Sequence, residues 1–124
     1  MTKLEILKQY FGHEKFRSGQ EDIIDNILSG KDVLGIMPTG AGKSVCYQVP
    51  AMLMDGITIV ISPLISLMKD QVRSLTESGI PSAYINSSLS YRQLREVFKR
   101  AAEMQYKIIY VAPCLLYTSD AADD

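Results

Sequence analysis

The chain has 124 residues, of which 47% are hydrophobic and 22% charged, and its formal net charge is −1. These values are typical of one soluble globular domain or part of one, and they exclude a strongly basic polyelectrolyte, so any nucleic-acid site must be local. No apolar run approaches membrane-spanning length, and Lys3, Glu5 and Lys8 interrupt any signal-peptide core, so a cytoplasmic protein without membrane contact is predicted. Cys46 and Cys114 fit neither a metal site nor a disulfide framework, and Cys46 is predicted to be a small buried side chain.

The first part of the sequence predicts two helices, a short strand and a third helix, in that order. Apolar spacing indicates an opening helix over residues 4–11 and a second helix over residues 19–28, which Gly30 ends. Residues 32–36 form a short apolar run and are predicted to be a strand. A glycine-rich segment follows, and then a helix is predicted over residues 45–54.

The glycine-rich segment, residues 37–44, has the sequence Met-Pro-Thr-Gly-Ala-Gly-Lys-Ser and is typical of a phosphate-binding loop. A strand–loop–helix order aims backbone N–H groups and a helix N-terminus at one anion. Lys43 can reach the outer phosphates, and the Ser44 hydroxyl is placed to ligate Mg²⁺. The alternative is a structural glycine-rich turn. The predicted nucleotide-binding residues here are Thr39, Gly40, Ala41, Gly42, Lys43 and Ser44.

The next segment predicts a buried strand and a long helix. Residues 57–61 are a continuous apolar run, as expected for a strand buried on both faces of a parallel sheet. Ser62 is predicted to be the N-cap and Pro63 the first position of a helix that runs to Ser78 and ends at Gly79. The predicted core face of this helix consists of Leu64, Leu67, Met68, Val72 and Leu75.

The last regular elements continue the alternation. Residues 83–85 are predicted to be a short strand, and residues 108–111 the next one. Between them, Ser90 and Gln93 form a capping-box pattern that opens a helix to about residue 103. Strands that alternate with helices predict an α/β fold, a parallel sheet flanked by helices. The basic residues of the last helix are interpreted as a solvated face: Arg92, Arg95, Lys99 and Arg100.

Residues 11–113 resemble the N-terminal part of the RecQ family of ATP-dependent DNA helicases. The resemblance rests on residues 11–20 (Phe-Gly-His-Glu-Lys-Phe-Arg-Ser-Gly-Gln), 37–44, 62–72 (Ser-Pro-Leu-Ile-Ser-Leu-Met-Lys-Asp-Gln-Val) and 85–87 (Ile-Asn-Ser). It implies a partial RecA-like P-loop NTPase domain. In the full-length protein this domain would bind ATP and Mg²⁺ and couple ATP hydrolysis to 3′→5′ unwinding of DNA, with single-stranded or branched DNA as its partner.

The resemblance also implies roles for residues outside the phosphate loop. Gln20 would hold adenine through its amide, which offers a donor and an acceptor, and Arg17 would support the nucleotide. His13 stands where relatives place a stacking aromatic ring. By sequence alone, Gln20 and His13 would instead be plain surface residues. DNA is implied to be held by phosphate rather than base contacts, through Ser62, Pro63, Ser66, Lys69, Asn86 and Ser87. The alternative for Asn86 and Ser87 is a simple turn.

Several parts of the family pattern do not occur in the sequence. The Asp-Glu-x-His block that holds Mg²⁺ and activates water is missing, as are the second motor domain, the arginine finger and the zinc module. We therefore expect residues 1–113 to be the N-terminal part of the ATP-binding domain, inactive alone. A sheet that stops at residue 111 is expected to expose an unpaired hydrophobic edge at residues 108–111.

Residues 114–124 resemble a translated sequencing adapter and are predicted to be a non-native tail. Cys-Leu stands at their start, where the family usually has Glu-Arg. The alternative is a genuine disordered acidic C-terminus. Two other functions remain open at this point: a fragment of a DEAD-box-like RNA helicase, or a nucleotide-binding fragment without enzymatic activity. The oligomeric state is not predicted.

Overall fold

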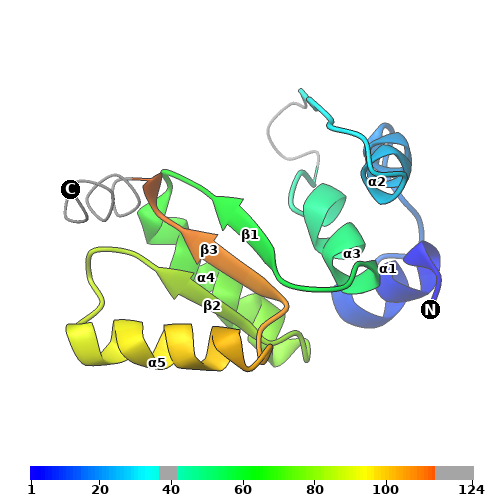
Figure 1. The fold of residues 1–124 in the computed structure, drawn as a ribbon. Coiled ribbons are helices and arrows are strands. Elements are labelled where there is room, and N and C mark those ends of the chain that lie inside the picture. Colours follow the sequence, from blue (N-terminus) through cyan, green and yellow to red (C-terminus); the bar gives the residue numbers. More distant parts are fainter. Residues whose placement is uncertain (37–41, 114–124) are drawn as a thin grey trace. The chain divides into compact units, whose positions relative to one another are not determined.

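The computed structural model describes residues 1–36 and 42–113. The chain divides into two compact units, Met1–Asp55 and Gly56–Asp124 (Figure 1). The described regular elements of the first unit are helices, whereas the second contains a sheet with helices on it. Among the described residues, no helix combines the length and the apolar character that crossing a membrane requires.

The first unit, called here the helical unit, contains three helices that confirm the predicted ones. They are α1 (Lys3–Phe11), α2 (Gln20–Leu28) and α3 (Val45–Leu53). Apolar side chains from all three bury one common core, which stabilises short helices that would be marginal alone. Lys3 also joins α1 to α2, because its ammonium lies 2.8 Å from Glu21 and 2.6 Å from Asp25. The buried core residues are Ile6, Leu7, Ile24, Val45 and Val49.

The prediction of a strand at residues 32–36 is wrong. The segment is irregular, and the side chains of Leu34 and Ile36 are each 89% exposed. A strand needs a neighbouring strand for its backbone hydrogen bonds, and the described regular elements of the helical unit are all helices. The segment instead passes close to α2, where a Cβ on Gly35 would lie 2.8 Å from Ile23 Cδ1.

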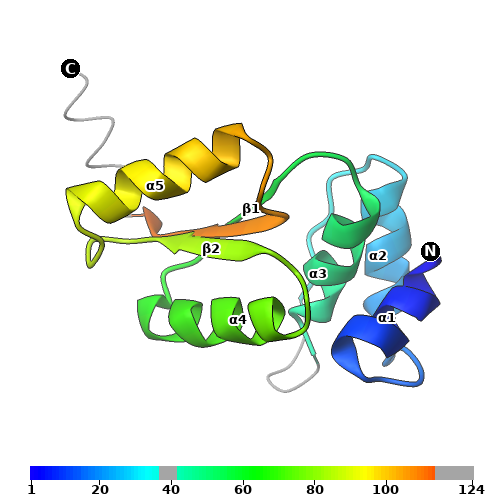
Figure 2. The same ribbon diagram turned by 90° about the horizontal axis from the view of Figure 1, so that it is seen from below.

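The second unit, called here the sheet unit, contains three parallel strands and two helices. Its elements are β1 (Thr58–Ile61), α4 (Ile65–Glu77), β2 (Ser82–Ile85), α5 (Tyr91–Ala102) and β3 (Ile108–Val111). The strand order is β1-β3-β2, and β3 pairs in parallel with both neighbours. Figure 2 shows α4 and α5 on opposite faces of this sheet. The predicted parallel sheet flanked by helices is confirmed.

The strand order corrects two predictions about exposure. Residues 108–111 were expected to be an unpaired edge, but β3 is the central strand and all four of its residues are buried. Residues 57–61 were expected to be buried on both faces, but β1 is an edge strand with alternating burial. Ile59 and Ile61 are 61% and 60% exposed. Although β3 comes last in the chain, it lies between β1 and β2 in the sheet, so it is the most buried of the three strands.

The helix ends of the sheet unit follow local hydrogen bonding. α4 begins at Ile65 and not at Pro63, because the Ser62 hydroxyl accepts from the N–H of Leu64 (3.2 Å) in a tight turn and does not cap the helix. The Ser62 N–H donates to the carbonyl of Val111 (3.1 Å), so Ser62 still continues the strand ladder. The capping box of α5 is confirmed, with reciprocal bonds of 3.2 and 2.9 Å between Ser90 and Gln93.

Candidate nucleotide site and nucleic-acid interface

Gln20 links the turn before α2 to the end of the predicted phosphate loop. Its side-chain oxygen accepts from the Arg17 N–H (2.8 Å), and its side-chain nitrogen donates to the carbonyl of Gly42 (3.0 Å). Gln20 is only 3% exposed, so it is not the plain surface residue that the sequence alone would suggest. Phe16, just before this turn, is half-buried against the helical core and holds the segment in place. The structure thereby brings Arg17, Gln20 and Gly42 together.

Gly42 has two separate reasons to be glycine. Its φ of 75° lies in the left-handed region, which costs a residue with a Cβ roughly 1–2 kcal/mol. A Cβ there would also lie 2.5 Å from the Gln20 side-chain nitrogen and 3.9 Å from Arg17 Cδ. The missing side chain therefore lets the loop backbone and the Gln20 amide approach each other closely.

Lys43 and Ser44 immediately precede α3. The carbonyls of Lys43 and Ser44 accept from the N–H groups of Cys46 (3.1 Å) and Gln48 (2.9 Å), so the helix grows directly out of this turn. Lys43 is exposed and Ser44 is half-buried. The Ser44 side chain makes no capping bond to the helix, so the hydroxyl is not used to start it. A cation, a hydroxyl and a helix N-terminus thus stand at one place, as a phosphate site requires. Thr39, Gly40 and Ala41 lie outside the described residues.

A small cavity of about 190 Å³ lies beside Lys43 within the helical unit. Its walls are largely apolar, and the segment after α2 forms one of them. Cys46 is 7% exposed, which confirms the predicted burial, and desolvation raises the pKa of its thiol. The lining residues are Ile23, Ile27, Val33, Gly35, Lys43, Cys46 and Tyr47. His13 is exposed and directly follows Gly12, the left-handed residue that ends α1.

In the sheet unit, two of the predicted nucleic-acid residues, Ser62 and Asn86, lie at the carboxyl edge of the sheet. Ile61 and Ile85 both pair with Val111, so the three strands end level with one another. Ser62 follows β1 and Asn86 follows β2, with β3 between them. With neighbouring strands about 4.8 Å apart, the two residues stand roughly 10 Å apart along this edge. Open parallel sheets place ligands at this edge.

Helix α4 has one buried apolar face and one exposed face, as the sequence suggested, but the buried face contains fewer residues than predicted. Met68 and Leu75 are buried at 1% and 3% exposure. Leu64 and Leu67 were expected in the core but are 57% and 45% exposed. The predicted DNA-contacting residues Pro63, Ser66 and Lys69 are all exposed.

Asn86 shapes the loop that follows β2. It is 2% exposed, and its side-chain oxygen accepts from the N–H of Ser88 (2.8 Å) and from the Ser88 hydroxyl. Ser87, between them, is exposed. The side-chain nitrogen of Asn86 is buried without a hydrogen-bond partner among the described residues. Such a buried donor without a partner costs about 1–3 kcal/mol of desolvation. The simple turn that the sequence alone suggested at Asn86 and Ser87 therefore does not account for the side-chain nitrogen of Asn86.

The Gln20–Gly42 bond is the feature that sequence reasoning missed. Its two residues are 22 positions apart, and no local pattern relates them. Gly42 itself carried the one available signal, because a glycine beside a lysine of a phosphate loop indicates a close backbone approach.

A parallel sheet flanked by helices, together with a Gly-Lys-Ser turn that opens a helix, defines the class of P-loop α/β proteins. The sequence pattern of the DEAD/DEAH box helicase family matches residues 17–120, and the chain belongs to this family. A solved structure, a hypothetical ATP-dependent RNA helicase from Sulfolobus tokodaii, superposes with a TM-score of 0.73 at 21% identity. The superposition covers 98% of this chain and 36% of that one, and it confirms the predicted RecA-like helicase fold.

Among curated proteins, the chain is similar to proteins named ATP-dependent DNA helicase RecQ, which confirms the resemblance. It is 50% identical to the Haemophilus influenzae protein over 112 residues, which is 90% of this chain and 18% of that protein. It is 52% identical to the Bacillus subtilis protein over 109 residues, or 87% of this chain and 18% of the relative. The chain therefore spans about a fifth of the length of these relatives.

Proposed function

We propose that this chain is part of the ATP-binding motor domain of a RecQ-type DNA helicase. The observation that carries the proposal is 50% identity to a RecQ helicase over 90% of the chain. The full-length protein would act in the cytoplasm, bind single-stranded or branched DNA, and couple ATP hydrolysis to 3′→5′ unwinding. The identity to DNA helicases favours DNA over RNA, since the RNA helicase structure is similar at the level of fold alone.

ATP is proposed to bind at the turn before α3. Lys43 is exposed there and would neutralise the outer phosphates, while Ser44 would place its hydroxyl on Mg²⁺. Gly42 and the preceding Thr39, Gly40 and Ala41 would supply backbone N–H groups. Bound Mg²⁺ would polarise the phosphate that is transferred.

The adenine end of the nucleotide is proposed to meet the segment before α2. Gln20 is already ordered by its bonds to Arg17 and Gly42, and its amide carries both a donor and an acceptor, the two groups that recognition of a base uses. Arg17 lies beside Gly42 and is placed to support the nucleotide. His13 would stack on adenine with less area than the aromatic ring that relatives use.

Single-stranded DNA is proposed to cross the carboxyl edge of the sheet. Ser62 and Asn86 mark two points of that edge, and Ser66 and Lys69 continue it along the exposed side of α4. These groups suit phosphate contacts, which position a strand without reading its sequence. Pro63 and Ser87 are exposed next to them.

Substitution of Lys43 tests the assignment. Lys43→Ala in the full-length protein is expected to lower ATP turnover by at least about 100-fold, because a positioned charge on the transferring phosphate is lost. Lys31→Ala removes another exposed lysine of the same unit and is the matched control. Near-normal ATP hydrolysis by Lys43→Ala would contradict the proposed ATP site at Lys43.

The 124-residue chain itself is proposed to bind ATP without turning it over, since it carries no Asp-Glu-x-His block. A steady-state ATPase assay with single-stranded DNA tests this, with Lys43→Ala as the baseline. Hydrolysis above that baseline would refute it.

Residues 1–113 are proposed to be the native part and residues 114–124 a non-native tail. Independent sequencing of the gene past Pro113 would contradict this if it encoded the same tail.

A further inference from the structure

Helix α5 concentrates positive charge. Its sequence, YRQLREVFKRAA, contains four basic residues and one acidic residue, although the whole chain has a net charge of −1. The acid, Glu96, accepts from Arg100 at 2.9 Å. Among residues 1–36 and 42–113, no carboxylate lies within salt-bridge distance of the other three cations. Tyr91 and these cations are called here the α5 basic face: Tyr91, Arg92, Arg95 and Lys99.

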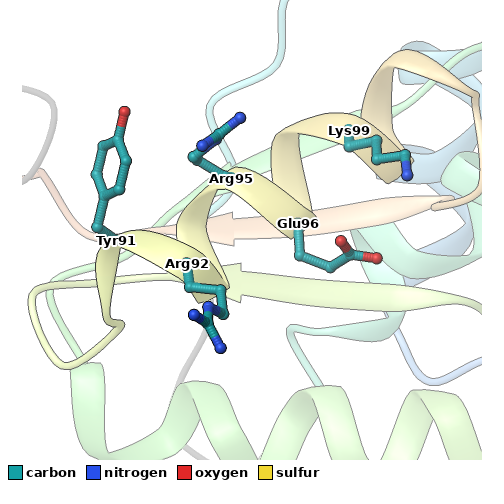
Figure 3. A pocket seen from close by; sticks show the side chains of 5 residues that line it. All are labelled: Tyr91, Arg92, Arg95, Glu96 and Lys99. Carbon is teal, nitrogen blue, oxygen red and sulfur yellow. The ribbon is translucent and has the colours of Figure 1, made fainter.

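The α5 basic face is a surface that folding does not need. The opposite side of α5 packs on the sheet core through Leu94, Val97 and Ala101. The residues of the α5 basic face, with Glu96, line one surface pocket, and Tyr91 is 76% exposed (Figure 3). Figure 3 shows Tyr91 and Arg95 on the same side of the helix, and the Arg95 guanidinium lies 5.8 Å from the centre of the Tyr91 ring.

The charge pattern of α5 is unlike that of a merely solvated helix. Solvated helices commonly place opposite charges three or four positions apart, where they attract each other. Glu96 follows that rule toward Arg92, Lys99 and Arg100, but the pairs Arg92–Arg95 and Arg95–Lys99 place like charges at these spacings. Like charges so placed repel one another, and an anionic ligand would relieve the repulsion.

The position of α5 indicates the kind of ligand. Its first residue, Tyr91, comes shortly after Asn86 and Ser87 in the chain, and α5 begins at the end of the loop that leaves the carboxyl edge of the sheet (Figure 2). The cations lie at positions 92, 95 and 99, which span about 10 Å along a helix. Each strand of a DNA duplex carries one phosphate per roughly 3.4 Å of axis, so a single strand stacked in the same way would place about three phosphates along this length.

We propose that the α5 basic face binds the phosphate backbone of single-stranded DNA that leaves the carboxyl edge of the sheet, with Tyr91 stacking on a base. Guanidinium groups suit phosphate oxygens, and an exposed ring accepts any base without reading sequence. This surface lengthens the strand path of the proposed function, on which the inference rests, by one helix beyond the predicted contact residues.

The first test measures binding of a fluorescent 20-nucleotide dT strand to the 124-residue chain by anisotropy at several salt concentrations. The variant R92Q/R95Q/K99Q is expected to bind at least about tenfold more weakly. The slope of log affinity against log salt should fall in magnitude by about 2, since each lost phosphate contact removes about 0.7. The matched control K8Q/K15Q/K31Q removes the same charge from exposed sites in the helical unit. Equal losses in the two triple variants would overturn the inference, because only net charge would then matter.

The second test separates stacking from charge and DNA from an acidic protein surface. Tyr91→Ala is expected to weaken dT binding at least about fivefold, and Tyr91→Phe to restore it, because stacking needs the ring and not the hydroxyl. Circular dichroism checks that every variant folds. Displacement of dT by poly-glutamate at equal charge concentration, with no effect of Tyr91→Ala, would overturn the inference in favour of an acidic polypeptide.

A third variant, Lys69→Gln, distinguishes this inference from the proposed function. If Lys69→Gln weakens dT binding while the α5 triple variant binds like the wild type, only the α5 basic face is refuted. If neither variant changes binding, the proposed strand path along the sheet edge fails as well. Weakening by both variants supports one continuous surface from α4 to α5.

Discussion

The helical unit and the sheet unit assemble their candidate functional residues in different ways. In the helical unit, one side-chain amide joins a turn and a phosphate loop, through Gln20, Arg17 and Gly42. In the sheet unit, strand pairing alone brings Ser62 and Asn86 to one edge, because both flanking strands share register with β3. The candidate nucleotide site therefore depends on a few specific hydrogen bonds, whereas the proposed strand path depends on the whole sheet.

This difference predicts where each unit is vulnerable. The ladder that aligns the sheet edge is distributed over several residues, and its centre, β3, is fully buried. Loss of packing there should disturb the edge as a whole. In the helical unit, the loss of one amide should disturb the site while the helical core remains packed.

The largest effect is expected at the centre of the sheet. Ile108 is fully buried at 0% exposure, so Ile108→Ala should lower the free energy of unfolding by about 2–5 kcal/mol. Ile59, on the edge strand, is 61% exposed, and Ile59→Ala should change it by about 0.5 kcal/mol or less. Urea unfolding followed by circular dichroism measures both. Equal losses would mean that β1 is as well covered as β3 and would break the comparison.

The next effect concerns Gln20, whose loss leaves the Arg17 N–H and the Gly42 carbonyl without this partner. Gln20→Ala should weaken ATP binding about tenfold or more, since groups deprived of a partner cost about 1–3 kcal/mol. The preference for ATP over GTP should also fall. Calorimetric titration with both nucleotides measures this.

A second substitution at the same position sharpens that test. Gln20→Glu keeps the oxygen that accepts from Arg17 but loses the donor to Gly42, so it isolates the link to the loop. If Gln20→Ala binds both nucleotides weakly yet keeps the wild-type preference for ATP, Gln20 positions the loop and does not select the base. Unchanged binding in both variants would show that the amide link has no role in the site.

A smaller effect is expected at the start of α5. The Ser90 hydroxyl accepts from the Gln93 N–H at 3.2 Å, so Ser90→Ala should lower the free energy of unfolding by about 1 kcal/mol. Ser90→Asp keeps an acceptor and should recover most of the loss. Ser87→Ala, at an exposed residue of the preceding loop, is the control. A loss at Ser87 equal to that at Ser90 would place the stability of this region in the loop and not in the helix cap.

The smallest effect is a pH dependence in the helical unit. Burial raises the pKa of the Cys46 thiol, so the folded chain holds that proton to higher pH than the unfolded chain does. This contribution to stability is complete below the ordinary thiol pKa of about 8.5 and is lost as pH rises through the folded value. The free energy of unfolding, measured from pH 7 to 10 in a Cys114→Ser background, should therefore fall less steeply with pH in Cys46→Ala than in the protein that keeps Cys46. Identical pH profiles would contradict the assignment.

Much of this protein is determined by its sequence through contacts a few residues apart. The helices, the capping box at Ser90 and the Gly-Lys-Ser turn are all local patterns, because caps and turns join residues at most four positions apart. The tertiary structure alone decided that β3 lies between β1 and β2, that Ile59 faces outward, and that residues 32–36 form no strand. It also decided that Gln20 meets Gly42. Each of these features depends on which distant segments of the chain meet, and a linear pattern of apolar and polar residues does not say which ones do.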